Sequence, residues 1–204
     1  MIKTNQVSKS IKDKVVLKDI NIELSKGEFI MLHGHNGSGK TMLLRLICQL
    51  IKPTTGTICY EGNPRFGVII ENPTFFQNET AFYNLKYLAS INKIIIDKDI
   101  HHWLKIFNLY DVKDKKVKSF SLGMRQRLAL IQAFMENPEV LLLDEPFNGV
   151  DDDNLKKIYD VLSKEKEQGK LIILASHVKI PIPELVTKEI GLSDGEIKSI
   201  KNLI

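Results

Sequence analysis

The chain has 204 residues, of which 43% are hydrophobic and 26% are charged, and its formal net charge is +4. These values are ordinary for a globular protein and exclude disordered and fibrous classes. No apolar run reaches the length of a membrane span and no signal-peptide core follows the basic start, so we expect a soluble, intracellular chain that forms one domain, residues 1–204.

The first third of the chain predicts a β-rich region. Residues 15–24 alternate between polar and apolar side chains, which is typical of a half-buried strand. Short apolar runs follow at residues 29–33, 57–60 and 66–70, with Gly and Pro in the connections. We therefore expect an antiparallel β subdomain at the N-terminus.

The middle of the chain changes to helical periodicity. Between residues 80 and 109, large apolar side chains recur at helical spacing: Phe82, Leu85, Leu88, Ile100, Trp103, Leu104 and Phe107. Another helix is predicted from Ser121 to about Asn137. We expect these helices to form an insertion at about residues 72–137.

The last third predicts a parallel sheet. Residues 140–143 and 171–175 are unbroken apolar runs. The helix predicted between them has an apolar face made of Leu155, Ile158, Tyr159 and Leu162. Such strands separated by helices favour a parallel sheet covered on both faces, and a hairpin is expected to turn at Asp194 and Gly195. The expected fold class is α/β, a parallel sheet flanked by helices.

Polar residues follow each predicted buried strand. The four apolar runs lead, in turn, into a glycine loop, Glu71, the pair Asp144 and Glu145, and the pair Ser176 and His177. Ligands of open α/β sheets bind at the carboxyl ends of the strands. We therefore expect these residues to converge on one site.

The glycine loop matches the phosphate-loop pattern, in which two glycines flank four residues and Lys-Thr follows. It consists of Gly34, His35, Asn36, Gly37, Ser38, Gly39, Lys40 and Thr41. Backbone N–H groups of such a loop and the following helix N-terminus bind anions. We expect Lys40 to bridge the β- and γ-phosphates and Thr41 to ligate Mg²⁺. The alternative, a glycine-rich turn with an unrelated lysine, fits the flanking strand and helix poorly.

Two carboxylates and a second helix start add to this chemistry. Asp144 ends a buried strand, where an unpaired charge is costly, and Mg²⁺ is its natural partner. Glu145 would then orient or deprotonate a water, the alternative being an exposed helix-capping pair. Ser121 is a favoured N-cap and Gly123 bares the first turn, which predicts either a second anion site or an ordinary cap.

Five segments occur in a specific order: GHNGSGKT (Walker A), FSLGMRQR (signature), VLLLDEP (Walker B), NGVD (D-loop) and SH (switch histidine). With these segments the whole chain resembles the ATP-binding subunit of an ATP-binding cassette (ABC) transporter. A phosphate loop alone admits kinases and GTPases, but a signature immediately before Walker B is peculiar to ABC proteins. The resemblance implies an ABC ATPase fold with a P-loop NTPase core, and hydrolysis of ATP with Mg²⁺.

The resemblance also implies a composite site. Two cassettes, identical or different, would meet head to tail, so that ATP on the glycine loop of one is capped by Ser121 and Gly123 of the other. Glu145 would be the catalytic base, His177 would contact the γ-phosphate, and Asp151 would lie at the dimer seam.

A separate transmembrane permease would carry the transport path, which places the chain in the cytoplasm on the inner face of the cell membrane. The aromatic residues of the insertion either pack within it or form a groove for a permease helix; they are Phe75, Phe76, Phe82, Tyr83 and Tyr87. The alternative function is a soluble ABC-type ATPase acting on nucleic acid or the ribosome. The chain lacks the long coiled coils of repair ATPases and the second cassette of translation ATPases, so no direct nucleic-acid partner is expected.

Three positions depart from the family pattern. The signature, usually Leu-Ser-Gly-Gly-Gln, reads FSLGM at residues 120–124, which retains the serine and the second glycine. Glu71 replaces the Q-loop glutamine and is expected to ligate Mg²⁺ more strongly than an amide; the alternative is that its carboxylate repels the triphosphate when the metal is absent. The aromatic residue that usually stacks on adenine falls near Ile11, so adenine selectivity should be weaker. The first two departures resemble exporters of peptide antibiotics and the transporters that confer immunity to them.

Overall fold

The computed structural model describes residues 1–71, 74–177 and 183–203. Its centre is a six-stranded sheet in the order β5-β6-β7-β3-β8-β9. The strands are β3 (Phe29–His33), β5 (Phe66–Ile69), β6 (Val140–Asp144), β7 (Leu171–Ala175), β8 (Lys188–Ser193) and β9 (Glu196–Asn202). All neighbouring pairs are parallel except β8 and β9, which form an antiparallel hairpin. The predicted parallel sheet is confirmed.

A second, antiparallel sheet has the order β2-β1-β4 and confirms the predicted N-terminal β region. Its strands are β1 (Ile2–Ile11), β2 (Lys14–Leu24) and β4 (Thr55–Tyr60). The strand β1 was not predicted because its sequence does not alternate between polar and apolar residues. Register shifts interrupt its pairing with β2, and Gln6 has a left-handed backbone with φ 49°.

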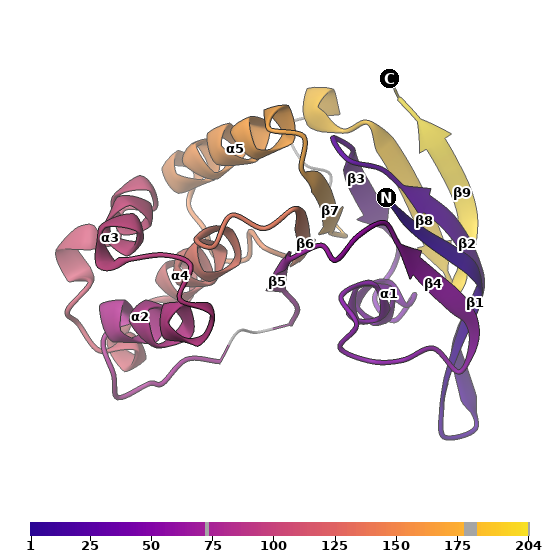
Figure 1. Ribbon diagram of the computed structural model, residues 1–204, viewed down its shortest axis with the longest axis horizontal. Coiled ribbons are helices and arrows are strands. Elements are labelled where there is room, and N and C mark those ends of the chain that lie inside the picture. Colours follow the sequence, from indigo (N-terminus) through magenta and orange to yellow (C-terminus); the bar gives the residue numbers. More distant parts are fainter. Residues whose placement is uncertain (72–73, 178–182, 204) are drawn as a thin grey trace.

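Helices cover both faces of the central sheet. They are α1 (Lys40–Ile47), α2 (Ala81–Asn92), α3 (Asp97–Ile106), α4 (Leu122–Phe134) and α5 (Asp152–Glu167), with short 3₁₀ helices η1 (Tyr110–Val112), η2 (Val117–Ser119) and η3 (Pro183–Leu185). Figure 1 shows α2, α3 and α4 to one side of β5 and β6, and α1 with the antiparallel sheet to the other.

Two hydrophobic cores result from the alternation of side chains along each strand. Leu141 and Leu143 of β6 lie in the core that includes α2–α5, whereas Leu142 lies in the core that includes α1 and the antiparallel sheet. The predicted apolar face of α5 packs on the first core, with Ile158 and Leu162 fully buried. Burial on both sides explains the unbroken apolar runs.

The excursion formed by α2, α3 and the two 3₁₀ helices η1 and η2 is closed at its base by backbone hydrogen bonds. Val117 donates to the carbonyl of Glu79 and Lys118 to that of Gln77, both at 3.0 Å. Trp103 of α3 and Phe107, the residue directly after α3, stack with Phe134 of α4. The predicted insertion at about residues 72–137 remains a prediction as a separate unit, and residues 72 and 73 lie outside the described part.

The hairpin of β8 and β9 supports the glycine loop. As predicted it turns at Asp194 and Gly195, both with positive φ. Gly195 donates its N–H to the carbonyl of Ser38 at 3.0 Å and accepts at its own carbonyl from Lys18 at 2.8 Å. A Cβ at Gly195 would lie 2.3 Å from the Val16 carbonyl oxygen, so only glycine allows this approach.

Candidate nucleotide site

The carboxyl ends of four adjacent strands, β5, β6, β7 and β3, meet at one edge of the sheet. The residues that follow these strands therefore converge, as predicted. A cavity of about 400 Å³ lies there. It is lined by Val16, Asn36, Gly37, Gly39, Lys40, Thr41, Met42, Arg45, Glu71, Asp144 and Glu145.

The glycine loop has the open geometry that an anion requires. Gly37 and Gly39 have φ angles of 82° and 107°, which side chains rarely adopt, and a Cβ at Gly37 would meet nothing within 4 Å. The Ser38 hydroxyl is buried and has no hydrogen-bond partner within the described part of the chain. Lys40 is only 7% exposed, and its ammonium donates to the carbonyls of Gly34 at 2.7 Å and His35 at 3.2 Å. A buried cation and an unpartnered hydroxyl fit a phosphate.

Thr41 and Asp144 meet at the start of α1. The Thr41 hydroxyl donates to Asp144 Oδ2 at 2.6 Å, and Asp144 is 7% exposed. Burial raises the pKa of the Asp144 carboxyl, the hydrogen bond from Thr41 opposes this, and the charge of Glu145 adds to it. Over the described ranges, no group of three His, Cys, Asp or Glu side chains could hold a metal. Mg²⁺ commonly combines one or two carboxylates with waters and substrate phosphate oxygens, a pattern that the pair of Thr41 and Asp144 fits.

Glu145 and His177 are brought together by β6 and β7. Glu145 Oε1 accepts from the His177 backbone N–H at 2.9 Å and lies 2.7 Å from His177 Nδ1. The Ser176 hydroxyl donates to Glu145 Oε2 at 3.3 Å. Helix α5 is capped by Asp151. The reading of Asp144 and Glu145 as a helix-capping pair is therefore wrong.

Glu71 has a partner that sequence reasoning missed. Its Oε1 accepts a hydrogen bond from Arg45 Nη2 at 2.6 Å. Arg45 lies four residues after Thr41 on α1, so helical spacing from the phosphate loop was the available signal. Direct metal ligation by Glu71 stays a prediction.

The signature residues lie away from the glycine loop of their own chain. Ser121 caps α4 by accepting from the Met124 N–H at 3.2 Å, and Figure 1 shows α4 and α1 on either side of β5 and β6. Neither Ser121 nor Gly123 is among the described residues that line the cavity. Gly123 is buried against the D-loop, where an added Cβ would lie 2.2 Å from the Gly149 carbonyl oxygen.

Comparison with known proteins identifies the family. Residues 17–148 match the family model described as ABC transporter. The chain belongs to the ABC transporter family. It is an ATP-binding cassette with ATPase activity, as predicted from its motifs.

Two curated relatives illustrate this membership. The uncharacterized ABC transporter ATP-binding protein YybJ of Bacillus subtilis is 39% identical and covers 100% of this chain and 98% of the relative. The bacitracin transport ATP-binding protein BcrA of Enterococcus faecalis is 35% identical over 91% of this chain and 64% of the relative.

Solved structures of an ABC cassette share the whole fold. The dimeric structure of MJ0796, a bacterial ABC transporter cassette, superposes with a TM-score of 0.90 at 28% identity, covering 100% of this chain and 99% of the other. A dimeric post-hydrolysis state of the same cassette, bound to ADP and Pi, also gives 0.90, at 26% identity. The predicted ABC ATPase fold is confirmed.

Two further observations on this ABC cassette concern the expected weak adenine selectivity and the search for membrane-spanning helices. Ile11 is 46% exposed at the β1–β2 turn and does not line the described cavity, whereas Val16 does. Reduced adenine selectivity stays a prediction. Among the described residues, no helix has the length and apolar character that crossing a membrane requires.

Proposed function

We propose that this cassette is the motor subunit of a transporter whose membrane path belongs to a separate permease. Two cassettes, identical or different, would bind ATP between the glycine loop of one and the Ser121–Gly123 tip of the other. The observation that carries this proposal is that neither Ser121 nor Gly123 is among the described residues lining the cavity at the glycine loop, with α4 and α1 on either side of β5 and β6 (Figure 1). A second cassette would complete both sites.

The nucleotide would supply a γ-phosphate polarised by Mg²⁺, and the residues of the chain would hold it in place. Lys40 is poised to exchange two loop carbonyls for phosphate oxygens. Backbone N–H groups of the loop would bind the same phosphates. Thr41 and Asp144 would hold Mg²⁺, with Glu71 as a further ligand.

Glu145 would act as the general base that accepts a proton from the attacking water. Its carboxylate oxygens are oriented by the Ser176 hydroxyl, the His177 backbone N–H and His177 Nδ1. His177 would contact the γ-phosphate once its side chain leaves Glu145. The two residues thus exchange a contact with one another for contacts with the substrate.

Exposed aromatic rings offer a surface for the permease. Phe76, Tyr83 and Tyr87 are 51%, 47% and 46% exposed and contact one another, with the Phe76 and Tyr87 ring centroids 5.1 Å apart. By contrast, Phe75 is buried and Phe82 packs against the core, so the aromatic set divides between packing and surface. Exposed aromatic clusters commonly mark interfaces. Docking there would place the cassette at the inner face of the cell membrane.

The name of BcrA supports export of a peptide or antibiotic as the transported class. The alternative, a soluble ABC-type ATPase acting on nucleic acid or the ribosome, is not favoured, because relatives with named roles, such as BcrA and the lantibiotic transport ATP-binding protein SrtF of Streptococcus pyogenes, act in transport.

Replacement of Glu145 by Gln tests the composite site. We expect Glu145→Gln to lower ATP hydrolysis by at least ~100-fold, the usual share of a general base, while ATP binding is retained. With ATP and Mg²⁺, the variant should accumulate as a dimer in light scattering, and a second substitution, Ser121→Tyr, should return it to monomer. A Glu145→Gln protein that binds ATP but stays monomeric at high concentration would contradict the proposal.

A further inference from the structure

The ion pair of Arg45 and Glu71 lies at the mouth of the nucleotide site. Arg45 projects from α1 one turn after Thr41, and its Nη2 lies 2.6 Å from Glu71 Oε1. The two side chains are 32% and 61% exposed, so neither is locked in place by burial. Both line the cavity that also contains Asp144.

The charges around this cavity are unevenly paired. Three carboxylates line it, those of Glu71, Asp144 and Glu145, and the cationic side chains in its described lining are Lys40 and Arg45. Lys40 donates to loop carbonyls, and its charge acts on the Asp144 carboxylate. Arg45 is therefore the cation that balances the carboxylate of Glu71.

This pairing has a consequence for metal binding. An Arg guanidinium stays protonated at every working pH and matches a carboxylate well. While Glu71 Oε1 accepts from Arg45, that oxygen is not free to ligate a cation held by Thr41 and Asp144. Glu71 Oε1 can ligate the metal only after its bond to Arg45 breaks, and the nearby guanidinium charge disfavours a second cation at Oε2 as well.

We infer that Arg45 is a positioning residue that controls how Glu71 engages Mg²⁺. The inference rests on the proposed nucleotide site and adds a competition to it: the guanidinium and the metal share one carboxylate. The competition weakens the binding of Mg²⁺ by Glu71. Removal of Arg45 should release Glu71 and raise the apparent affinity for Mg²⁺.

A double-mutant cycle isolates this effect from the general loss of a positive charge. Binding of a non-hydrolysable fluorescent ATP analogue would be titrated with Mg²⁺ for the wild type, Arg45→Gln, Glu71→Gln and the double variant. With Glu71 present, Arg45→Gln should lower the half-saturating Mg²⁺ concentration about threefold, within the range for an exposed ion pair. In the Glu71→Gln background, the same change should have a much smaller effect.

Two further variants control for charge and folding. Arg65 and Glu139 form an exposed pair at 3.2 Å, just before β5 and β6 and thus at the opposite edge of the sheet, so Arg65→Gln removes an equal charge away from the site. Arg45→Lys keeps the charge on α1 and should stay close to the wild type.

Equal shifts with and without the Glu71→Gln substitution, with nucleotide binding intact, would overturn the role of Arg45 and leave the proposed function standing. A protein that binds no nucleotide at any Mg²⁺ concentration would overturn the proposed function as well.

Discussion

Two acidic residues of the site have left-handed backbones. Glu71 has φ 59° and Glu145 has φ 46°, a region that costs an ordinary side chain about 1–2 kcal/mol. Both residues directly follow buried strands, at the edge where a sharp change of direction aims their carboxylates into one cavity. Other non-glycine residues share this conformation in turns, but at Glu71 and Glu145 it falls where the chemistry is proposed.

Tyr60 ties the end of the phosphate-loop helix to the antiparallel sheet. Its hydroxyl donates to the carbonyl of Ile47 at 2.9 Å, and burial raises the pKa of Tyr60 to about 12. Because the folded-state pKa lies above the ordinary value of 10, the stability that Tyr60 contributes is complete below pH 10 and is lost as the pH rises through 12.

We expect Tyr60→Phe to remove this alkaline loss. Wild-type stability should fall by about 1 kcal/mol more than that of the variant between pH 9 and pH 12, after allowance for the solvent that screens a half-buried ring. Urea denaturation across this pH range measures the difference. Parallel pH profiles for the two proteins would show that Tyr60 does not carry the effect.

The residues of the site that follow strands could be predicted, whereas their side-chain partners could not. Parallel strands bring their carboxyl ends to one edge, so Glu71, Asp144 and Glu145 were placed together by strand order alone. Helical spacing places Arg45 one turn after Thr41, but its pairing with Glu71 depends on how α1 packs on the sheet, which no local pattern encodes. A helix position such as Arg45 can point in many directions until packing is known.

At the level of elements, the signature helix and the D-loop are held together within one chain. Gly123 allows α4 to approach the Gly149 carbonyl. Arg127 of α4 donates to Asn154 Oδ1 at 3.1 Å, and Asn154 Nδ2 donates to both oxygens of Asp151 at 2.8 Å. The two segments proposed to face a second cassette are therefore positioned by shared contacts.

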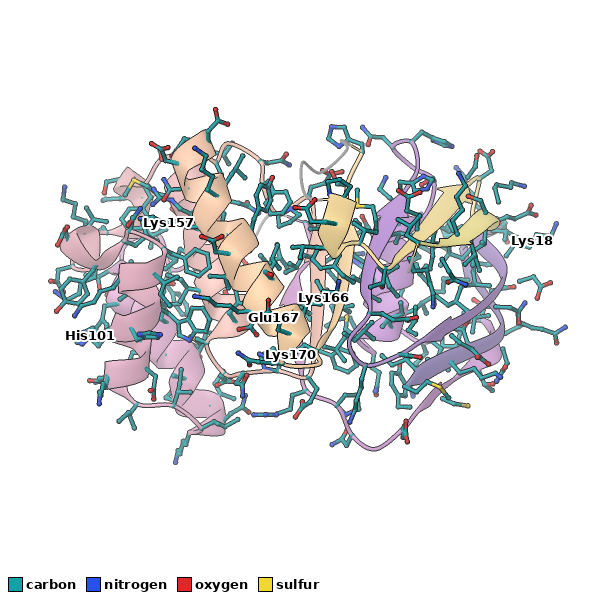
Figure 2. All side chains as sticks on the ribbon, turned by 90° about the horizontal axis from the view of Figure 1, so that it is seen from above. Lys18, His101, Lys157, Lys166, Glu167 and Lys170 are labelled. Carbon is teal, nitrogen blue, oxygen red and sulfur yellow. The ribbon has the colours of Figure 1, made fainter. Side chains whose placement is uncertain are left out.

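The partners of α5 extend these contacts toward α3. Figure 2 shows Lys157 near one end of α5 and Lys170 near the other. Lys157 donates to Asn108 Oδ1 at 2.8 Å, next to the end of α3, while Lys170 forms a buried ion pair with Glu165. Helix α5 is thus fixed at both ends, which supports the position of the D-loop at its start.

We expect Gly123→Ala to separate the signature helix from the D-loop. The added methyl group meets a backbone oxygen, which cannot swing away like a side chain, so the variant should lose about 1–3 kcal/mol of stability. Urea denaturation measures this loss, and light scattering in the Glu145→Gln background should show less ATP-dependent dimer. Thr80→Ala is the matched control, since it removes the cap of α2 at a cost of about 1 kcal/mol and leaves the signature helix and the Gly149 contact intact. A midpoint equal to that of the wild type would argue against the close contact.

The elements were predictable where periodicity was clean and missed where it was not. The apolar runs of β3, β6 and β7 follow from burial on both faces by α1 and α5. The sequence of β1 does not alternate, because bulges change which side chains face the core. Long-range pairing with β2 and β4 therefore decides its conformation rather than its own pattern.

At the scale of the whole molecule, the candidate nucleotide site and the aromatic surface lie on different parts of the fold. The edge formed by the carboxyl ends holds the candidate nucleotide site, and α2 presents Tyr83 and Tyr87 on the far side of β5. We expect Tyr87→Asp to lower co-purification of the permease at least ~10-fold, as for a central aromatic contact, without changing ATP hydrolysis by the isolated cassette.

Leu50, an exposed apolar residue after α1, provides the control for this test, because Leu50→Asp adds the same charge outside the aromatic surface. Comparable loss of the permease in both variants would exclude a specific role for the α2 surface.

The backbone hydrogen bonds that join Gln77 and Glu79 to residues 117 and 118 make the α2–α3 excursion a closed loop on the sheet. Changing the length of such a loop costs little, because closure entropy grows only slowly with size. Transplanting the α2–α3 excursion between related cassettes should therefore change which permease the cassette binds. The residues proposed to bind and hydrolyse ATP lie outside the excursion and would stay unchanged. New transported substrates could then be acquired without any change in the nucleotide site.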